Sequence, residues 1–143
     1  MTTFFVPGVP RPQGSKKSFG RGRMVESSRH VKGWRATISA VARSEASPLS
    51  GPVEVEILFI MPRPKATSRR RPTPPAIKRP DIDKLERAVL DGLTGLAWRD
   101  DSQVVDLHSR KRIAEPDEQP GVQITYRPSS WYAELAEMCG KAA

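Results

Sequence analysis

Four aspartates stand at two points of the chain where secondary-structure elements are expected to begin. Asp81 and Asp83 lie two residues apart at the start of a segment with helical periodicity, and Asp100 and Asp101 precede a β-prone stretch. Neighbouring carboxylates repel one another unless a cation neutralises them, and oxygen-only sites suit hard divalent ions such as Mg²⁺ or Mn²⁺. A bound ion of this kind lowers the pKa of a water and stabilises charge on a phosphate. One hypothesis is therefore a metal site for phosphate chemistry.

The same aspartates also have structural interpretations. Asp83 with Glu86 three residues later resembles a capping box at a helix start, and an Asp-Asp pair is common in polar turns. Zinc is disfavoured as the metal, because His30 and His108 are far apart in the sequence and Cys139 is the only cysteine. Spacing alone leaves both the structural and the metal-binding interpretation open.

A basic residue accompanies the acids along the expected helix. Asp83, Arg87 and Asp91 are spaced at i, i+4 and i+8, so they share one polar face. Arg87 could form an ordinary helix ion pair, which would stabilise the helix by about 0.3 kcal/mol. It could equally be a fixed cation beside the metal, directed at the phosphate to be cleaved.

The elements that must position these residues follow from hydrophobic periodicity. Alternating apolar residues predict strands over 2–6, about 53–60, 103–112 and 122–126. Helical spacing predicts helices at about 30–45 and 82–94, with a short C-terminal helix around Trp131 to Met138. This order predicts one α+β domain over 1–143, a small mixed β-sheet with two main helices packed on it.

The charge is divided unevenly along the chain. The net charge is +8, but residues 1–80 contain 16 basic and 4 acidic residues (+12), and residues 81–143 contain 8 and 12 (−4). The basic half includes two turn-rich segments, about 10–29 and 62–80, and the acidic residues concentrate in 81–106. A basic surface for a polyanion beside acids that hold a cation would explain this division, as would mutual neutralisation of the two halves.

Composition narrows the class of protein. One cysteine permits no intrachain disulfide, which fits a reducing, intracellular compartment. The longest apolar run, Ile57 to Met61, is far shorter than the ~20 residues of a membrane helix, and the first ten residues do not resemble a signal peptide. We expect an intracellular, cytoplasmic protein without a membrane partner.

Three spaced segments resemble the RusA family of Holliday junction resolvases. The first is Lys78 to Leu85 (Lys-Arg-Pro-Asp-Ile-Asp-Lys-Leu), the second Leu90 to Thr94 (Leu-Asp-Gly-Leu-Thr), and the third Trp98 to Val105, which contains Asp-Asp-Ser-Gln-Val. The N-terminal segment from Val9 to Lys16 is similar to the family's more loosely. The resemblance is specific because the three segments agree in order and separation.

The resemblance implies a small homodimeric, Mg²⁺-dependent endonuclease that makes paired nicks in four-way DNA junctions, with Mn²⁺ as a substitute ion. It implies that Asp81, Asp83 and Asp101 bind the metal and are catalytic. Two residues depart from the family pattern: Lys84 stands where Asn is frequent, and Arg87 where Lys is frequent. Because arginine keeps its proton, Arg87 would hold a phosphate rather than transfer a proton.

The basic residues would then contact DNA phosphates, giving salt-sensitive binding that is largely independent of sequence. A non-enzymatic nucleic-acid-binding protein is the alternative, as is a metal-dependent nuclease that acts on flaps or RNA. A pure binder gains nothing from converging carboxylates, which favours the enzyme. The residues expected to contact DNA are Lys16, Lys17, Arg21, Arg23, Arg69, Arg70, Arg71 and Lys84.

Overall fold

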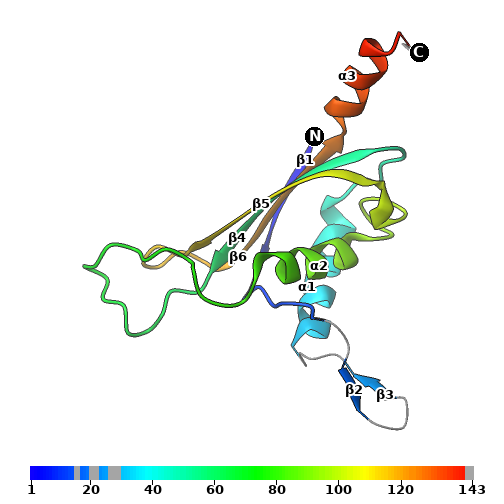
Figure 1. Ribbon diagram of the computed structural model, residues 1–143. Helices are drawn as coiled ribbons and strands as arrows, with labels where there is room; N and C mark the ends of the chain where they lie inside the picture. Colours follow the sequence, from blue (N-terminus) through cyan, green and yellow to red (C-terminus); the bar gives the residue numbers. More distant parts are fainter. Residues whose placement is uncertain (15–16, 20–22, 26–29, 141–143) are drawn as a thin grey trace.

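The structure is a computed structural model of the chain (Figure 1). It describes residues 1–143 except 15–16, 20–22, 26–29 and 141–143, and describes only the backbone of the short strands β2 and β3.

A four-stranded mixed sheet forms the centre of the fold. Its strand order is β1-β6-β4-β5, with β4 parallel to β5 and antiparallel to β6, and with β6 antiparallel to β1. The parallel pair is joined through a helix, the crossover that parallel neighbours require. The predicted mixed sheet is thus confirmed, with its strands at Thr2–Pro7 (β1), Val53–Met61 (β4), Val104–Ile113 (β5) and Gly121–Pro128 (β6).

Two helices, α1 (Val31–Glu45) and α2 (Ile82–Leu93), cover one face of this sheet, as Figure 1 shows. Alternate residues of β4, such as Val55 and Phe59, are fully buried against the helices. α1 and α2 approach closely at Gly92, where an added Cβ would lie 3.0 Å from Ile38 Cγ2. The sequence pattern predicted both helices to within about one residue at each end.

The remaining elements lie outside this two-layer core. β2 (Lys17–Phe19) and β3 (Arg23–Val25) form a separate two-stranded hairpin within the turn-rich segment 10–29. α3 (Ser130–Met138) extends away from the sheet after β6 and has no buried residue (Figure 1). None of the described helices is long and apolar enough to cross a bilayer.

Residues 62–80 contain no regular element but are held in place by side chains. The Arg63 guanidinium donates to Thr73 Oγ1 (2.6 Å) and to the Ser68 and Arg71 carbonyls (2.9 Å each). Thr73 Oγ1 in turn donates to Glu115 Oε2 (2.7 Å), in the turn between β5 and β6. The proline-rich loop is therefore fixed to the sheet through its polar groups.

Candidate active site

The start of α2 positions two of the candidate acids. Asp81 is the N-cap residue but its side chain accepts no capping hydrogen bond, and Asp83 lies inside the first turn. The Glu86 carboxylate accepts a hydrogen bond from Ser109 Oγ of β5 (2.6 Å) instead of returning to the helix start. The capping-box interpretation of Asp83 and Glu86 is therefore wrong, because β5 lies within reach of Glu86 and supplies a donor. Asp81 and Asp83 both remain exposed.

The polar face predicted for α2 is exposed along its length. Asp83, Arg87 and Asp91 are all exposed, and no ion pair among the described residues includes Arg87. Lys84 Nζ lies 3.7 Å from Asp81 Oδ2, a contact between two exposed side chains. The helix thus presents two carboxylates and one cation to the outside.

A tight turn before β5 positions the other two acids. Asp100 Oδ1 accepts a hydrogen bond from Ser102 N (2.9 Å), and Gln103 Oε1 accepts one from Asp100 N (3.2 Å), which together form a capping box on the 3₁₀ turn η1 (Asp101–Gln103). The bond from Ser102 holds the pKa of Asp100 below its usual value. Gln103 Nε2 ties this turn to the Leu49 carbonyl (3.0 Å). The structural interpretation of the Asp-Asp pair is thus correct for Asp100.

Asp101 has a different environment from Asp100. Desolvation raises the pKa of the Asp101 carboxyl, and contact with Asp100 and the charge of Asp91 raise it further. Crowded carboxylates of this kind lower their energy when a cation arrives. Asp101 and Asp91 are therefore the two acids that the fold brings near each other at the C-terminal end of α2.

The structure places Asp81 and Asp83 at the opposite end of α2 from Asp101. α2 and β5 run in opposite directions: Lys111 Nζ of β5 donates to the Pro80 carbonyl just before α2 (2.8 Å), whereas Asp101 precedes the start of β5. The strand from Val104 to Lys111 alone spans about 23 Å at roughly 3.3 Å per residue. Figure 1 shows the loop into α2 and the turn before β5 at different ends of the helix. A single chain does not bring the three acids together.

The donor chemistry of these residues fits a hard divalent cation, because every candidate ligand is a carboxylate oxygen. Among the residues that the structure describes, however, no group of three histidine, cysteine, aspartate or glutamate side chains is close enough to hold a metal ion. Asp81, Asp83 and Asp101 thus have the chemistry of ligands for a divalent cation, but within one chain they lie at opposite ends of α2.

Two residues near the site were not singled out from the sequence. Gln13 donates to Asp91 Oδ2 (2.5 Å) through Nε2 and accepts from Arg35 Nη1 (2.7 Å), so it links the N-terminal segment, α1 and α2. Lys111 Nζ holds the Lys78 and Pro80 carbonyls (3.0 and 2.8 Å) and so places a cation beside the start of α2. In the sequence, Gln13 is marked only by the loose resemblance of the N-terminal segment to the family, and Lys111 is not marked by any motif.

The residues expected to contact DNA have varied environments. Lys16 and Arg21 lie outside the described residues, and Lys17 and Arg23 belong to β2 and β3. The Arg69 guanidinium forms a two-pronged ion pair with Asp117, which raises the pKa of Arg69 and lowers that of Asp117. Arg70 and Arg71, the other two loop arginines expected to contact DNA, are exposed and form no ion pair with a described residue.

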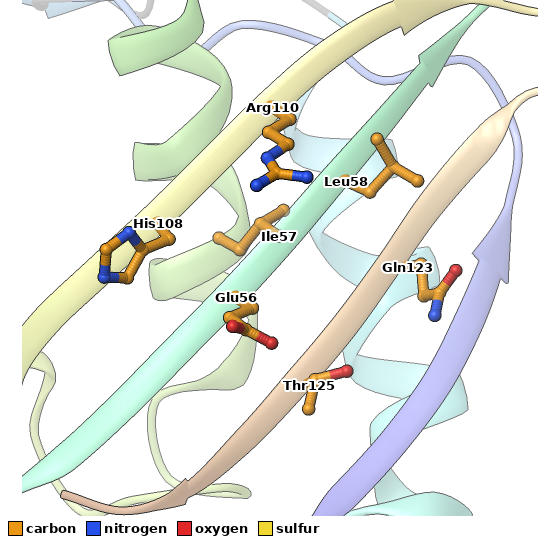
Figure 2. Close-up of a pocket in the computed structure, with 7 residues that line it drawn as sticks. All are labelled: Glu56, Ile57, Leu58, His108, Arg110, Gln123 and Thr125. Atoms are coloured by element: carbon orange, nitrogen blue, oxygen red, sulfur yellow. The ribbon is translucent and has the colours of Figure 1, made fainter. Parts of the chain in front are cut away.

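The sheet face opposite the helices carries a second set of polar side chains. Figure 2 shows Glu56 and Leu58 of β4 between His108 and Arg110 of β5 and Gln123 and Thr125 of β6, around a shallow pocket of about 300 Å³. Asp106 belongs to this face, where its Oδ1 lies 2.9 Å from His108 Nε2. None of the metal-binding candidates lines this pocket.

Comparison with known proteins agrees with the sequence resemblance. A family model described as endodeoxyribonuclease RusA matches residues 7–127, which include α1, α2, β4, β5 and all but the last residue of β6. The chain is also 32% identical over 145 residues to the uncharacterized protein YqaN of Bacillus subtilis (strain 168), covering 89% of this chain and 96% of that protein. The matched region contains all four aspartates and both basic loops. The chain therefore belongs to the RusA family of endodeoxyribonucleases, the family of Holliday junction resolvases.

Proposed function

We propose that the chain is a Mg²⁺-dependent, structure-selective endonuclease that hydrolyses phosphodiester bonds in four-way or other branched DNA inside the cell. The single observation that carries this proposal is the exposed face of α2, which presents Asp83, Arg87 and Asp91. None of the ion pairs among the described residues includes Arg87, so no ion pair within the chain explains its presence there. A protein that only bound DNA would gain nothing from carboxylates exposed beside its basic surface.

The metal ligands in this proposal are Asp81, Asp83 and Asp101, and two copies of the chain supply them. α2 and β5 are antiparallel to each other, and β5 has a neighbour on only one side in the described sheet. If a two-fold axis passed near the middle of these elements, α2 and β5 of the second copy would run in the opposite directions to those of the first. Asp101 of one copy would then lie beside Asp81 and Asp83 of the other. A homodimer would hold two such centres, as two symmetric nicks require.

Each residue has a distinct role in this proposal. Bound Mg²⁺ supplies a water of lowered pKa and stabilises negative charge on the phosphate. The three aspartates hold the ion, with Mn²⁺ as the expected substitute. Arg87, one helical turn from Asp83, binds a non-bridging phosphate oxygen and stabilises charge that grows as the bond breaks. It takes no part in proton transfer, because its guanidinium stays protonated.

One gel tests this function. Labelled four-way junction and linear duplex of the same sequence are incubated with the protein, with Mg²⁺ or with EDTA. We expect paired nicks in the junction with Mg²⁺ alone, and little cutting of the duplex. Binding of the junction without any cutting in Mg²⁺ or Mn²⁺ would instead identify a non-enzymatic binder. Flapped DNA and structured RNA on the same gel distinguish the remaining nuclease substrates.

A further inference from the structure

A groove of about 700 Å³ lies immediately before the start of α2. Its walls come from three parts of the chain: the N-terminal segment 9–12, the proline-rich loop 62–80, and the ends of β4 and β5, at Met61 and Ile113. Pro80, which lines the groove, is the residue directly before Asp81. A ligand in the groove would therefore lie next to the proposed metal ligands.

The lining combines apolar surface with positive charge. Met61 and Ile113 line the groove together with several prolines, and no acidic residue lines it. Its basic lining residues include Arg11, Lys78 and Arg79. Apolar, flat surfaces accept a nucleobase by stacking, and the cations complement the phosphate to which that base is attached. The volume lies in the range of ordinary ligand pockets, about 300–1,000 Å³.

The groove is formed before any ligand arrives. The hydrogen bonds of Arg63 and the ion pair of Arg69 with Asp117 brace the loop, and Lys111 Nζ fixes the Lys78 and Pro80 carbonyls at its end. Because these contacts already order the loop, a ligand does not have to supply that ordering free energy. A rigid groove of fixed shape suits one flat group of defined size.

We infer that this groove receives one unstacked DNA base, belonging to the strand that is cut at the proposed metal site beside Asp81. The inference rests on the proposed function and adds a basis for its selectivity. Removing a base from the stack is least costly where pairing is already disturbed, as at the branch point of a junction. A linear duplex would have to bear the full cost of unstacking. The groove would thus favour branched DNA over duplex before any bond is cut.

Filling the groove tests the inference. Ala76 and Ala66 both line it, so Ala76→Trp and, as an independent second variant, Ala66→Trp occupy the space of the base. Ile77→Trp is the matched control, because Ile77 follows Ala76 in the same loop, is 84% exposed and does not line the groove. Binding to four-way junctions is measured in EDTA, so that cleavage plays no part, with single abasic sites placed in turn near the branch point. Circular dichroism confirms that each variant is folded.

We expect one abasic position to weaken binding by the wild-type protein by about 5- to 150-fold, the range for loss of one stacked base. Ala76→Trp and Ala66→Trp should bind the intact junction more weakly by a similar factor and should be insensitive to that abasic site, whereas Ile77→Trp behaves like wild type. Unchanged binding by the folded groove variants overturns the inference, as does an abasic effect that persists in them. If the groove instead holds a second copy of the chain, the groove variants should sediment differently from wild type in the absence of DNA. That result would also overturn the inference.

Failure of the proposed function is read separately. If the wild-type protein never nicks any junction in Mg²⁺, the endonuclease proposal is wrong. The coupling between abasic site and groove variant is still measured in EDTA, so the two outcomes are distinguishable.

Discussion

At the level of single residues, Asp83 separates catalysis from binding most sharply. Its carboxylate is exposed, caps no helix and faces away from the core. We expect Asp83→Asn to reduce junction nicking by at least about 100-fold, because a metal ligand is lost, while junction affinity in EDTA stays the same or rises slightly. The measurement pairs a nicking time course with a binding titration.

Asp106→Asn is the matched control for this change. It also removes one aspartate charge, but Asp106 pairs with His108 on the face of the sheet away from the helices. Nicking by Asp106→Asn should therefore remain close to wild type. Wild-type nicking by Asp83→Asn in Mg²⁺ would show that Asp83 holds no essential ion.

Glu54 is one of the residues whose ionisation contributes to stability. Its buried carboxylate accepts hydrogen bonds from Arg127 and from Ser130 N (3.2 Å) and Oγ (3.1 Å), and these lower the pKa of Glu54 despite its burial. A carboxyl whose pKa is lower in the folded state stabilises the fold above its unfolded pKa of about 4.3, and this contribution is lost as pH falls through the folded pKa.

Glu54→Gln should therefore lower the free energy of unfolding at pH 7 by about 1–3 kcal/mol, less than for a fully buried pair because Arg127 is partly exposed. The difference in the free energy of unfolding between Glu54→Gln and wild type should shrink toward pH 3. Urea denaturation at both pH values measures it. Glu56→Gln, at an exposed neighbour 3.6 Å from Arg127 Nη2, should have little effect at either pH. An equal loss for both variants would contradict the special role of Glu54.

At the level of elements, the turn η1 determines where Asp101 points. Gln103 closes the capping box and donates to the Leu49 and Gly51 carbonyls (3.0 Å each). We expect Gln103→Ala to reduce the free energy of unfolding by about 1–2 kcal/mol and to reduce nicking more strongly than binding. Ser102→Ala is the milder comparison, because it keeps the hydrogen bond from Ser102 N to Asp100 and removes only the interaction of the Ser102 side chain with Asp100. Equal nicking by the two variants would mean that the turn does not position Asp101.

The elements themselves could be predicted from the sequence, because their residues repeat with the period of the structure they form. Ile82, Leu85, Val89 and Leu93 gave α2, and the alternation from Val53 to Phe59 gave β4. Contacts between elements carry no such local signal. The spacing of Asp83 and Glu86 predicts a capping box, because nothing in the sequence indicates that Ser109 Oγ lies 2.6 Å from Glu86 Oε2.

The same limit applied to the candidate site. The sequence identified four aspartates at two element boundaries but could not say which boundaries meet in space. α2 and β5 run antiparallel to each other, so Asp101 lies near Asp91 at the C-terminal end of α2 and far from Asp81 at its start. Asp91 lies in the second family-like segment and on the polar face of α2, but neither sequence signal indicates that it lies near Asp101.

At the level of the whole molecule, the uneven charge predicts how binding depends on salt. Removing Lys16 and Lys17 together should weaken junction binding and flatten its salt dependence by up to about two counterions, if each contacts one phosphate. The control is Lys32→Ala with Arg43→Ala, which removes the same charge from two exposed positions on α1. An equal change in slope for both pairs would show that net charge, rather than contact at Lys16 and Lys17, sets the affinity.

The arrangement of the metal centre is also a whole-molecule property, and subunit mixing tests it. Asp83→Asn and Asp101→Asn are each expected to be inactive alone. If Asp101 of one copy completes the site at Asp81 and Asp83 of the other, a mixed dimer has one site with both changes and one site with neither. Random mixing in equal amounts makes half of the dimers mixed, so about one quarter of all sites should be intact. Nicking should return to about that level, mostly as single nicks.

A second mixture makes this result specific to sites shared between copies. Asp81→Asn mixed with Asp83→Asn changes two ligands from the same end of α2, so every site in the mixed dimer keeps one defect and nicking stays absent. If instead each chain held its three ligands by itself, both mixtures would remain inactive, because every chain carries a damaged site. Refolding the mixed chains from urea allows exchange of subunits, and a gel that resolves single from paired nicks reads the outcome. Recovery in the first mixture alone would place the catalytic centre between two chains, where the opposite ends of α2 can meet.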